Sequence, residues 1–325
     1  MLRLIRYKNL IFTALLQLLV YGCIILPTLQ SYQFDESLGI VKLLTLVLST
    51  VFITAGGYVI NDYFDLKIDR INRPDKVIVG TLITKEQTMK LYQALTITGI
   101  ALGIYLAFSL KSITLGFIYI VVPGMLWFYS SSYKRMLIVG NLIVAFCAAL
   151  VPLMPMLAMQ QILETNWSSD IYNTPIIREL YTFVGVIAIF AFLWTFIREI
   201  IKDMQDVYGD RELECHTIPV VWGGKTARII VIALIVITCA LLIWLSTKAD
   251  IGHNTTLTLK YAVWGIVLPS VCLIGILLKN DLSAPRNASN LCKFIMLIGT
   301  CYCIVYNIMM AQGYDVTLFG LFKLA

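Results

Sequence analysis

The chain has 325 residues, of which 59% are hydrophobic and only 14% are charged. Soluble domains carry about 25% charged residues and roughly 45–50% apolar ones, so this composition excludes an ordinary soluble protein. It predicts a polytopic membrane protein. The net charge of +6 would suit nucleic acid, but the basic residues are scattered between hydrophobic runs. That distribution is typical of membrane topology signals, and we expect no nucleic-acid partner.

Apolar runs long enough to cross a bilayer, about 20 residues each, recur along the whole chain. Lipid offers no hydrogen-bond partner to an open backbone, so each run is expected to be helical. The sequence therefore predicts an all-α bundle of about nine transmembrane helices that forms a single domain over residues 1–325. The expected spans are 10–30, 40–61, 87–108, 112–131, 137–159, 178–200, 226–246, 258–278 and 290–311.

Most of the 25 Lys and Arg residues fall between these spans on one side of the expected bundle. The positive-inside rule assigns that side to the cytoplasm. We therefore expect a multi-pass integral membrane protein with a cytoplasmic N-terminus, located in the inner membrane if the source is bacterial. The two acidic motifs described next fall on the same side.

The first motif follows an apolar run that ends at residue 60. At about 100° per residue, Asn61, Asp62, Asp65 and Asp69 fall within an arc of about 100° on one helix face. Clustered carboxylates repel one another unless a cation lies between them. Oxygen ligands of this kind suit Mg²⁺, which binds through one or two carboxylates, several waters and substrate phosphates. The alternative is a solvated acidic turn that caps a membrane helix.

A second acidic motif repeats this spacing after another long apolar run. Its members are Asp203, Asp206 and Asp210. They fall within about 60° on a helix, and Glu199 points into the same arc. Arg198 and Lys202 flank the motif and place cations beside the anions. Two carboxylate faces with basic neighbours could together hold a diphosphate through Mg²⁺.

A secondary transporter is the alternative from another functional class, since transporters also use carboxylates to couple ions. Transporters place such groups near the bilayer midplane, in broken helices. Here both acidic motifs follow the cytoplasmic ends of spans, which favours an enzyme.

At these residues the sequence resembles the UbiA-type intramembrane prenyltransferases. Residues 61–69 match the family's N-D-x-x-D-x-x-x-D motif, and residues 72–74 match the N-R-P segment that follows it. Asp206 and Asp210 match the second motif, D-x-x-x-D. Asp203 and Gly209 give the form D-x-x-D-x-x-G-D, which resembles the branch of chlorophyll synthases, homogentisate prenyltransferases and archaeal-type lipid enzymes.

The resemblance implies a helical bundle around a central cavity that is open to the cytoplasm and to lipid. It implies Mg²⁺-dependent transfer of a prenyl group, in which the two motifs converge and stabilise the departing diphosphate. The residues predicted to be catalytic are Asp62, Asp65, Asp203 and Asp206. The predicted metal ligands are Asp62, Asp65, Asp69, Asp203, Asp206 and Asp210. The residues predicted to bind substrate are Asn9, Asn61, Arg73, Tyr129, Lys134, Arg198 and Lys202.

Several of these assignments have simpler alternatives. Asn9 could be an ordinary helix cap, Tyr129 and Lys134 could serve interfacial anchoring, and Arg73 could be a solvated positive-inside residue. The expected partners are an isoprenyl diphosphate donor, a lipophilic acceptor and membrane lipids, and nothing in the sequence indicates an obligate protein partner. The branch resemblance favours a prenylglycerol phosphate as the acceptor. An aromatic precursor of quinones is the alternative acceptor.

Overall fold

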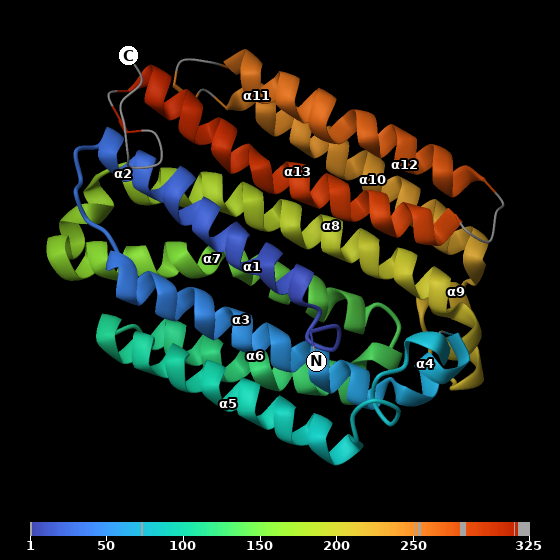
Figure 1. The fold of residues 1–325 in the computed structure, drawn as a ribbon. Coiled ribbons are helices and arrows are strands. Elements are labelled where there is room, and N and C mark those ends of the chain that lie inside the picture. The colour runs from blue at the N-terminus through green and yellow to red at the C-terminus, as the bar shows by residue number, and fades with distance from the viewer. Residues whose placement is uncertain are drawn as a thin grey trace.

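Helices account for almost all of the chain described by the computed structural model, which comprises residues 2–72, 74–249, 251–252, 255–279, 284–314 and 316–317 (Figure 1). Within these ranges there is no strand, and the only extended pairing is an isolated bridge between Val79 and Ile83. The helices are α1 Tyr7–Leu19, α2 Leu26–Ser31, α3 Gly39–Phe64, α4 Leu66–Asn72, α5 Lys85–Leu110, α6 Ile113–Ser131, α7 Val139–Trp167, α8 Ile176–Glu212, α9 Ile218–Val221, α10 Gly223–Lys248, α11 Thr255–Tyr261, α12 Leu268–Leu278 and α13 Ala284–Gly313.

The described residues contain nine helical stretches that are long and apolar enough to cross a membrane. Each overlaps one predicted span, so the prediction of an all-α, multi-pass membrane protein is confirmed. Two stretches are composite: Tyr7–Ser31 joins α1 to α2, and Thr256–Leu278 joins α11 to α12. The largest departure from the predicted bounds is α8, which continues to Glu212, beyond its apolar run.

Both composite spans contain a π-helical turn just before a proline. The turns are Val20–Ile25, before Pro27, and Ala262–Val267, before Pro269. Proline has no N–H to donate, and its ring clashes with the carbonyl one turn earlier. A π turn widens the helix locally, which makes room for the ring without breaking the span.

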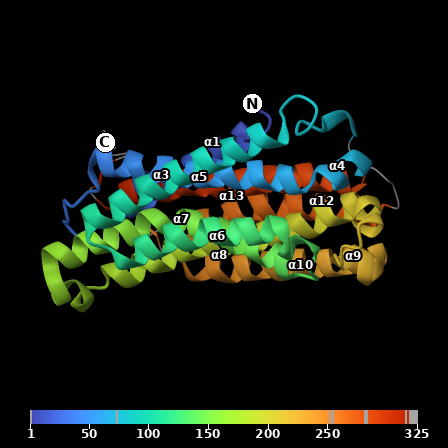
Figure 2. The ribbon, with the colours of Figure 1, turned by 90° about the horizontal axis from the view of Figure 1, so that it is seen from below.

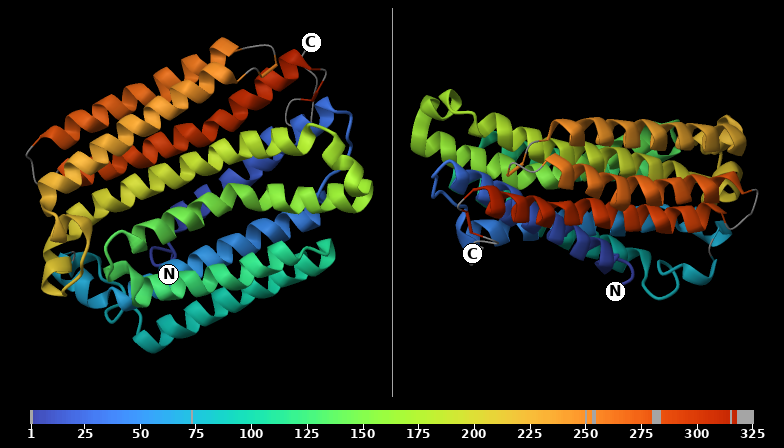
Figure 3. Two further views of the ribbon diagram at one scale, coloured as in Figure 1. Left: turned by 180° about the vertical axis from the view of Figure 1, so that it is seen from behind. Right: turned by 90° about the horizontal axis from the view of Figure 1, so that it is seen from above.

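α8 lies at the centre of the packing. It contacts α7 on one side and α13 and α10 on the other (Figures 1 and 3). Its buried residues divide between the two large hydrophobic clusters of the described chain, and α13 also contributes to both. Successive spans alternate in direction, so α4 and α9 lie at the same end of the bundle (Figures 1 and 2). That end also receives the end of α3 and the end of α8.

A small third hydrophobic cluster lies beside the end of α3. It joins Leu4, from the segment before α1, to Val59, Leu66 and Val79. Leu4 is fully buried. Its burial fixes the segment that leads into α1 against the part of α3 that carries the first acidic motif.

Close contact between α5 and α6 depends on Gly103, because a Cβ there would lie 2.3 Å from the ring of Tyr119. We expect Gly103→Ala to lower the thermal unfolding temperature, since overpacking a core costs about 1–3 kcal/mol. The matched control is Gly124→Ala in α6, whose Cβ would meet nothing within 4 Å. This control should be neutral or slightly stabilising, because alanine favours a helix by about 1 kcal/mol over glycine. Equal behaviour of the two variants in detergent would contradict this packing.

Candidate active site

The first acidic motif spans the junction between α3 and α4. Asp62 lies near the end of α3, Asp65 forms the junction and Asp69 belongs to α4. The sequence predicted one uninterrupted helix here, whereas the structure has a turn at Asp65. Two backbone hydrogen bonds cross that turn, from Asp65 N to Asn61 O at 2.9 Å and from Asp69 N to Asp65 O at 2.8 Å. The i to i+4 register of the motif is therefore kept.

Asp65 is the most enclosed carboxylate of this motif, with 7% of its side chain exposed. Asn61 Nδ2 donates to Asp65 Oδ2 at 2.6 Å. The ammonium of Lys134, from the short 3₁₀ turn between α6 and α7, forms an ion pair with the same oxygen. Burial by itself would lower the pKa of Lys134, but the charge and hydrogen bond of Asp65 outweigh it and raise the pKa. The lysine is therefore charged at neutral pH.

Asp62 is held by Arg6, a residue that the sequence analysis did not select. Arg6 Nη2 lies 2.8 Å from Asp62 Oδ1, and the guanidinium also lies 5.0 Å from the centroid of the Tyr58 ring. Burial opposes the charged form of Arg6, but the charge of Asp62 raises its pKa. The predicted residue Asn9 does not reach the carboxylate and instead donates to Tyr58 Oη at 3.2 Å. The signal that could have found Arg6 is its position one turn before Asn9.

The second acidic motif lies on one continuous helix, as predicted. Asp203, Asp206 and Asp210 belong to the last turns of α8. Asn141 Nδ2, from α7, donates to Asp203 Oδ2 at 2.8 Å, and Thr217 Oγ1 donates to Asp210 Oδ2 at 3.2 Å. Asn141 was also missed by the sequence analysis, since a single polar residue at the start of an apolar run carries no distinctive signal.

Arg198 and Lys202, both predicted to bind substrate, are engaged with Glu199. Arg198 Nη1 lies 3.0 Å from Glu199 Oε1, and Lys202 Nζ lies 2.6 Å from Glu199 Oε2. The glutamate side chain is only 7% exposed. These three side chains form a compact ionic cluster on the turn of α8 that leads into Asp203, with one more positive than negative charge.

The structure brings the two acidic motifs together through α4 and α8. The ammonium of Lys134 forms an ion pair with Asp65 of the first motif and lies in electrostatic range of Asp69 and of Asp210, which belongs to the second motif. The phenol of Tyr129, at the end of α6, is in electrostatic range of Asp65 and of Asp203. Tyr129 and Lys134 therefore lie near carboxylates of both motifs. The predicted residue Arg73 lies outside the described part of the chain.

The donor atoms of this region fit Mg²⁺ in kind, because carboxylate and amide oxygens are hard ligands. No group of three Asp, Glu, His or Cys side chains among the described residues is arranged as a ready-made metal site. Mg²⁺ commonly binds through one or two carboxylates together with substrate phosphates. The donor set therefore fits a metal ion that is shared with a phosphate-bearing substrate better than one held by a complete protein cage.

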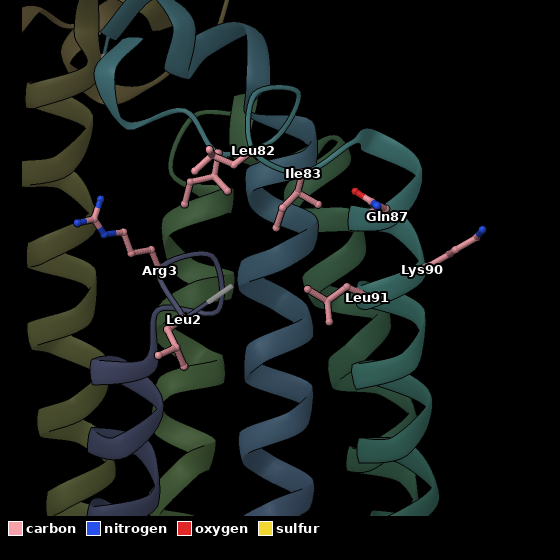
Figure 4. Close-up of a pocket in the computed structure, with 8 residues that line it drawn as sticks. Leu2, Arg3, Leu82, Ile83, Gln87, Lys90 and Leu91 are labelled. Atoms are coloured by element: carbon pink, nitrogen blue, oxygen red, sulfur yellow. The ribbon is translucent and has the colours of Figure 1, made fainter.

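A cavity of about 950 Å³ lies beside this region (Figure 4). It is bordered by residues 2–3, by the turn at 78–83 and by the first turns of α5. Its lining is mostly apolar, with the Lys90 side chain directed away from it in Figure 4. None of the predicted site residues lines this cavity, and the central cavity expected from the sequence stays a prediction.

Comparison with known proteins identifies the family. The model of the UbiA prenyltransferase family matches residues 24–298. The chain belongs to the UbiA prenyltransferase family. It is 30% identical over 255 residues to digeranylgeranylglyceryl phosphate synthase from Ignicoccus hospitalis, a match that covers 77% of this chain and 78% of that relative. The family places this chain among the prenyltransferases and confirms that it is an enzyme.

Solved structures share the fold of this UbiA-family chain. An apo UbiA homolog from Aeropyrum pernix K1 superposes with a TM-score of 0.66 at 16% identity, covering 91% of this chain and 98% of that one. A UbiA homolog from Archaeoglobus fulgidus bound to DMAPP and Mg²⁺ gives a TM-score of 0.60 at 17% identity, covering 94% and 98%. At these identities the two comparisons show a common helical architecture.

The Lys134–Asp65 pair generates a prediction about stability. Removing one partner of a buried ion pair leaves an uncompensated charge, which costs about 3–5 kcal/mol. We expect Lys134→Met to lower the thermal unfolding temperature and Lys134→Met with Asp65→Asn to restore most of the loss.

The raised pKa means that the pair is complete below the ordinary lysine pKa of 10.5 and is lost only as pH rises above it. The same ranking should therefore hold from pH 6 to about pH 9. A double variant no more stable than the single one would contradict the pairing.

Proposed function

We propose that the two acidic motifs of this prenyltransferase hold an isoprenyl diphosphate and Mg²⁺ between the end of α3, α4 and the end of α8. The observation that carries the proposal is the contact of α4 with α8, beside the ion pair between Lys134 and Asp65, with Asp69 and Asp210 in electrostatic range of the same lysine. Ionisable groups buried at membrane depth are costly and usually functional, and Asp65 and Asp210 are both buried. The proposed metal ligands are Asp62, Asp65, Asp69, Asp203, Asp206 and Asp210.

The chemistry follows from the charges of these side chains. Mg²⁺ held there would neutralise diphosphate oxygens and favour their departure from the allylic carbon. Arg6 and Lys134 lie beside Asp62 and Asp65, and their N–H groups could also donate to the diphosphate oxygens. The forked guanidinium of Arg6 suits two phosphate oxygens at once. In the reaction the C1–O bond breaks with its electron pair on diphosphate, and an acceptor oxygen then bonds to C1 and releases its proton to the diphosphate or to solvent. The Tyr129 ring could stabilise the allylic cation by about 2 kcal/mol when desolvated.

The proposed acceptor is a prenylglycerol phosphate. The 30% identity to a digeranylgeranylglyceryl phosphate synthase supports this choice. A second argument is the supply of cations, because an enzyme that joins two anionic lipids must hold two head groups. Arg198 and Lys202 together exceed the charge of Glu199 and lie on the turn of α8 that leads into Asp203, so they are the proposed contacts for the acceptor phosphate.

The proposed orientation places this site on the cytoplasmic side. The segments that carry Arg6, the first motif, Lys134 and the end of α8 lie at one end of the bundle, and most of the basic residues of the chain also fall there. We also propose that the whole chain is a single domain, because α8 and α13 contribute to both large hydrophobic clusters.

The metal-binding role predicts that Asp65→Asn and Asp206→Asn each abolish turnover. The isosteric amide keeps the shape of the side chain but removes the charge that holds a hard cation. Metal polarisation contributes several kcal/mol, so product formation should fall by at least about 10²-fold. The measurement is Mg²⁺-dependent release of diphosphate from geranylgeranyl diphosphate in the presence of acceptor.

Asp170→Asn, in the exposed segment between α7 and α8, is the matched control and should retain normal activity. Near-normal turnover by either motif variant would reject the assignment.

The acceptor assignment predicts an effect on the acceptor KM. Lys202→Gln should raise the KM of a prenylglycerol phosphate about tenfold, since a hydrogen bond to a charged group contributes about 1.5–3 kcal/mol. Lys225→Gln, an exposed lysine at the start of α10, is the control and should leave that KM unchanged. The assay should compare prenylglycerol phosphates with hydroxylated aromatic rings as acceptors. Prenylation of the aromatic rings alone would replace the proposed acceptor with a quinone precursor.

A further inference from the structure

Asn72, the last residue of α4, bridges the backbone of α8. Its Nδ2 donates to the carbonyl oxygen of Asp206 at 3.1 Å, and its Oδ1 accepts from the N–H of Gly209 at 2.9 Å. One amide side chain therefore bonds to a donor and an acceptor in the same turn of the helix.

Gly209 leaves the space that this bridge needs. A Cβ at position 209 would lie 2.6 Å from Asn72 Nδ2 and 2.8 Å from Oδ1. The glycine lies inside α8, and its backbone is not in the left-handed region. Glycine within a helix is unfavourable relative to alanine, so the local backbone gives no reason for it. The close approach of the Asn72 amide does.

The bridge joins the two acidic motifs directly. Asn72 follows Asp69 on α4 and ends the helix that begins next to Asp65. Gly209 lies between Asp206 and Asp210 on α8. Fixing α4 against this turn of α8 therefore fixes the separation of the carboxylates on the two helices.

That separation matters for a metal ion shared between helices. Mg²⁺ demands near-ideal octahedral geometry, with oxygen distances of about 2.0–2.1 Å. Misplacing reacting groups by about 1 Å can cost on the order of 10²-fold in rate. A hydrogen-bonded pair that holds the separation would therefore act on the reaction without touching the substrate.

We infer that Asn72 and Gly209 are positioning residues that together set the distance between the two acidic motifs. The inference rests on the proposed function, because it assigns the purpose of that distance to the binding of Mg²⁺ and diphosphate. The same contact also explains why the N-R-P segment begins with asparagine, Asn72, and why the second motif contains a glycine, Gly209.

The test is a double-mutant cycle with Asn72→Ala, Gly209→Ala and the double variant. Asn72→Ala removes both hydrogen bonds, and Gly209→Ala displaces the amide and so breaks the same bonds. Each single variant should raise the Mg²⁺ concentration for half-maximal activity, and the KM for geranylgeranyl diphosphate, about tenfold. The double variant should be no worse than Asn72→Ala, because the added methyl then has nothing to collide with. Gly185→Ala, on the same helix with nothing within 4 Å of its Cβ, is the matched control.

A second readout does not depend on turnover. Mg²⁺ with inorganic diphosphate should raise the thermal unfolding temperature of the wild-type protein and of Gly185→Ala, because a ligand that binds the folded state stabilises it. This rise should be smaller by half or more in both single variants. The inference is overturned if the variants keep the wild-type rise and the wild-type Mg²⁺ requirement while their unfolding temperatures fall, since the bridge would then serve stability alone. Additive effects in the double variant would also overturn it. An absence of prenyl transfer by the wild-type protein would reject the proposed function, and the thermal rise would still report on the bridge.

Discussion

A carboxylate at the end of an apolar helix has to be matched by a donor, and this requirement organises the polar end of the protein. Desolvation of a charge costs several kcal/mol unless a partner compensates it. Asp62 has Arg6, Asp65 has Lys134 and Asn61, and Asp203 has Asn141. Apart from Asn61, each of these partners belongs to a different segment of the chain from the carboxylate that it contacts. The two ion pairs therefore join the segment before α1 and the α6–α7 turn to the first motif, and a hydrogen bond joins α7 to the second.

The hydrophobic core of the bundle fixes the position of the second acidic motif. α8 contributes fully buried residues such as Trp194 to one hydrophobic cluster and Val184 to the other. Its last turns then leave the apolar environment and carry Asp203, Asp206 and Asp210. Because α8 is one continuous helix, its packing in the core also determines where the second motif lies. The first motif lacks such continuity, since α3 ends one residue before Asp65, and its position depends on contacts with neighbours.

The sequence predicted those features that depend on local periodicity. Nine spans followed from apolar length, and the faces of both acidic motifs followed from the helical repeat, because neither requires knowledge of distant residues. The turn at Asp65 was not predicted, since no glycine or proline marks it. Arg6 and Asn141 were missed because their roles arise from packing between segments far apart in the chain. Asn9 was selected in place of Arg6, although it contacts Tyr58 rather than a carboxylate. Arg198 and Lys202 were correctly placed beside the second motif, but their pairing with Glu199 depends on side-chain conformations that spacing alone does not give.

The separation of these partners along the chain has a consequence for biosynthesis. Arg6 precedes Asp62 by 56 residues, Asp65 precedes Lys134 by 69, and Asn141 precedes Asp203 by 62. During translation each early partner reaches the membrane before the residue that will neutralise or bond it. Unpaired ionisable groups at membrane depth are costly. In order of synthesis, Asp62 can pair with Arg6 once α3 is made, whereas Asp65 meets Lys134 only after α6. The polar end can be completed only after α8 has emerged, which makes the order of insertion part of how this enzyme acquires its active form.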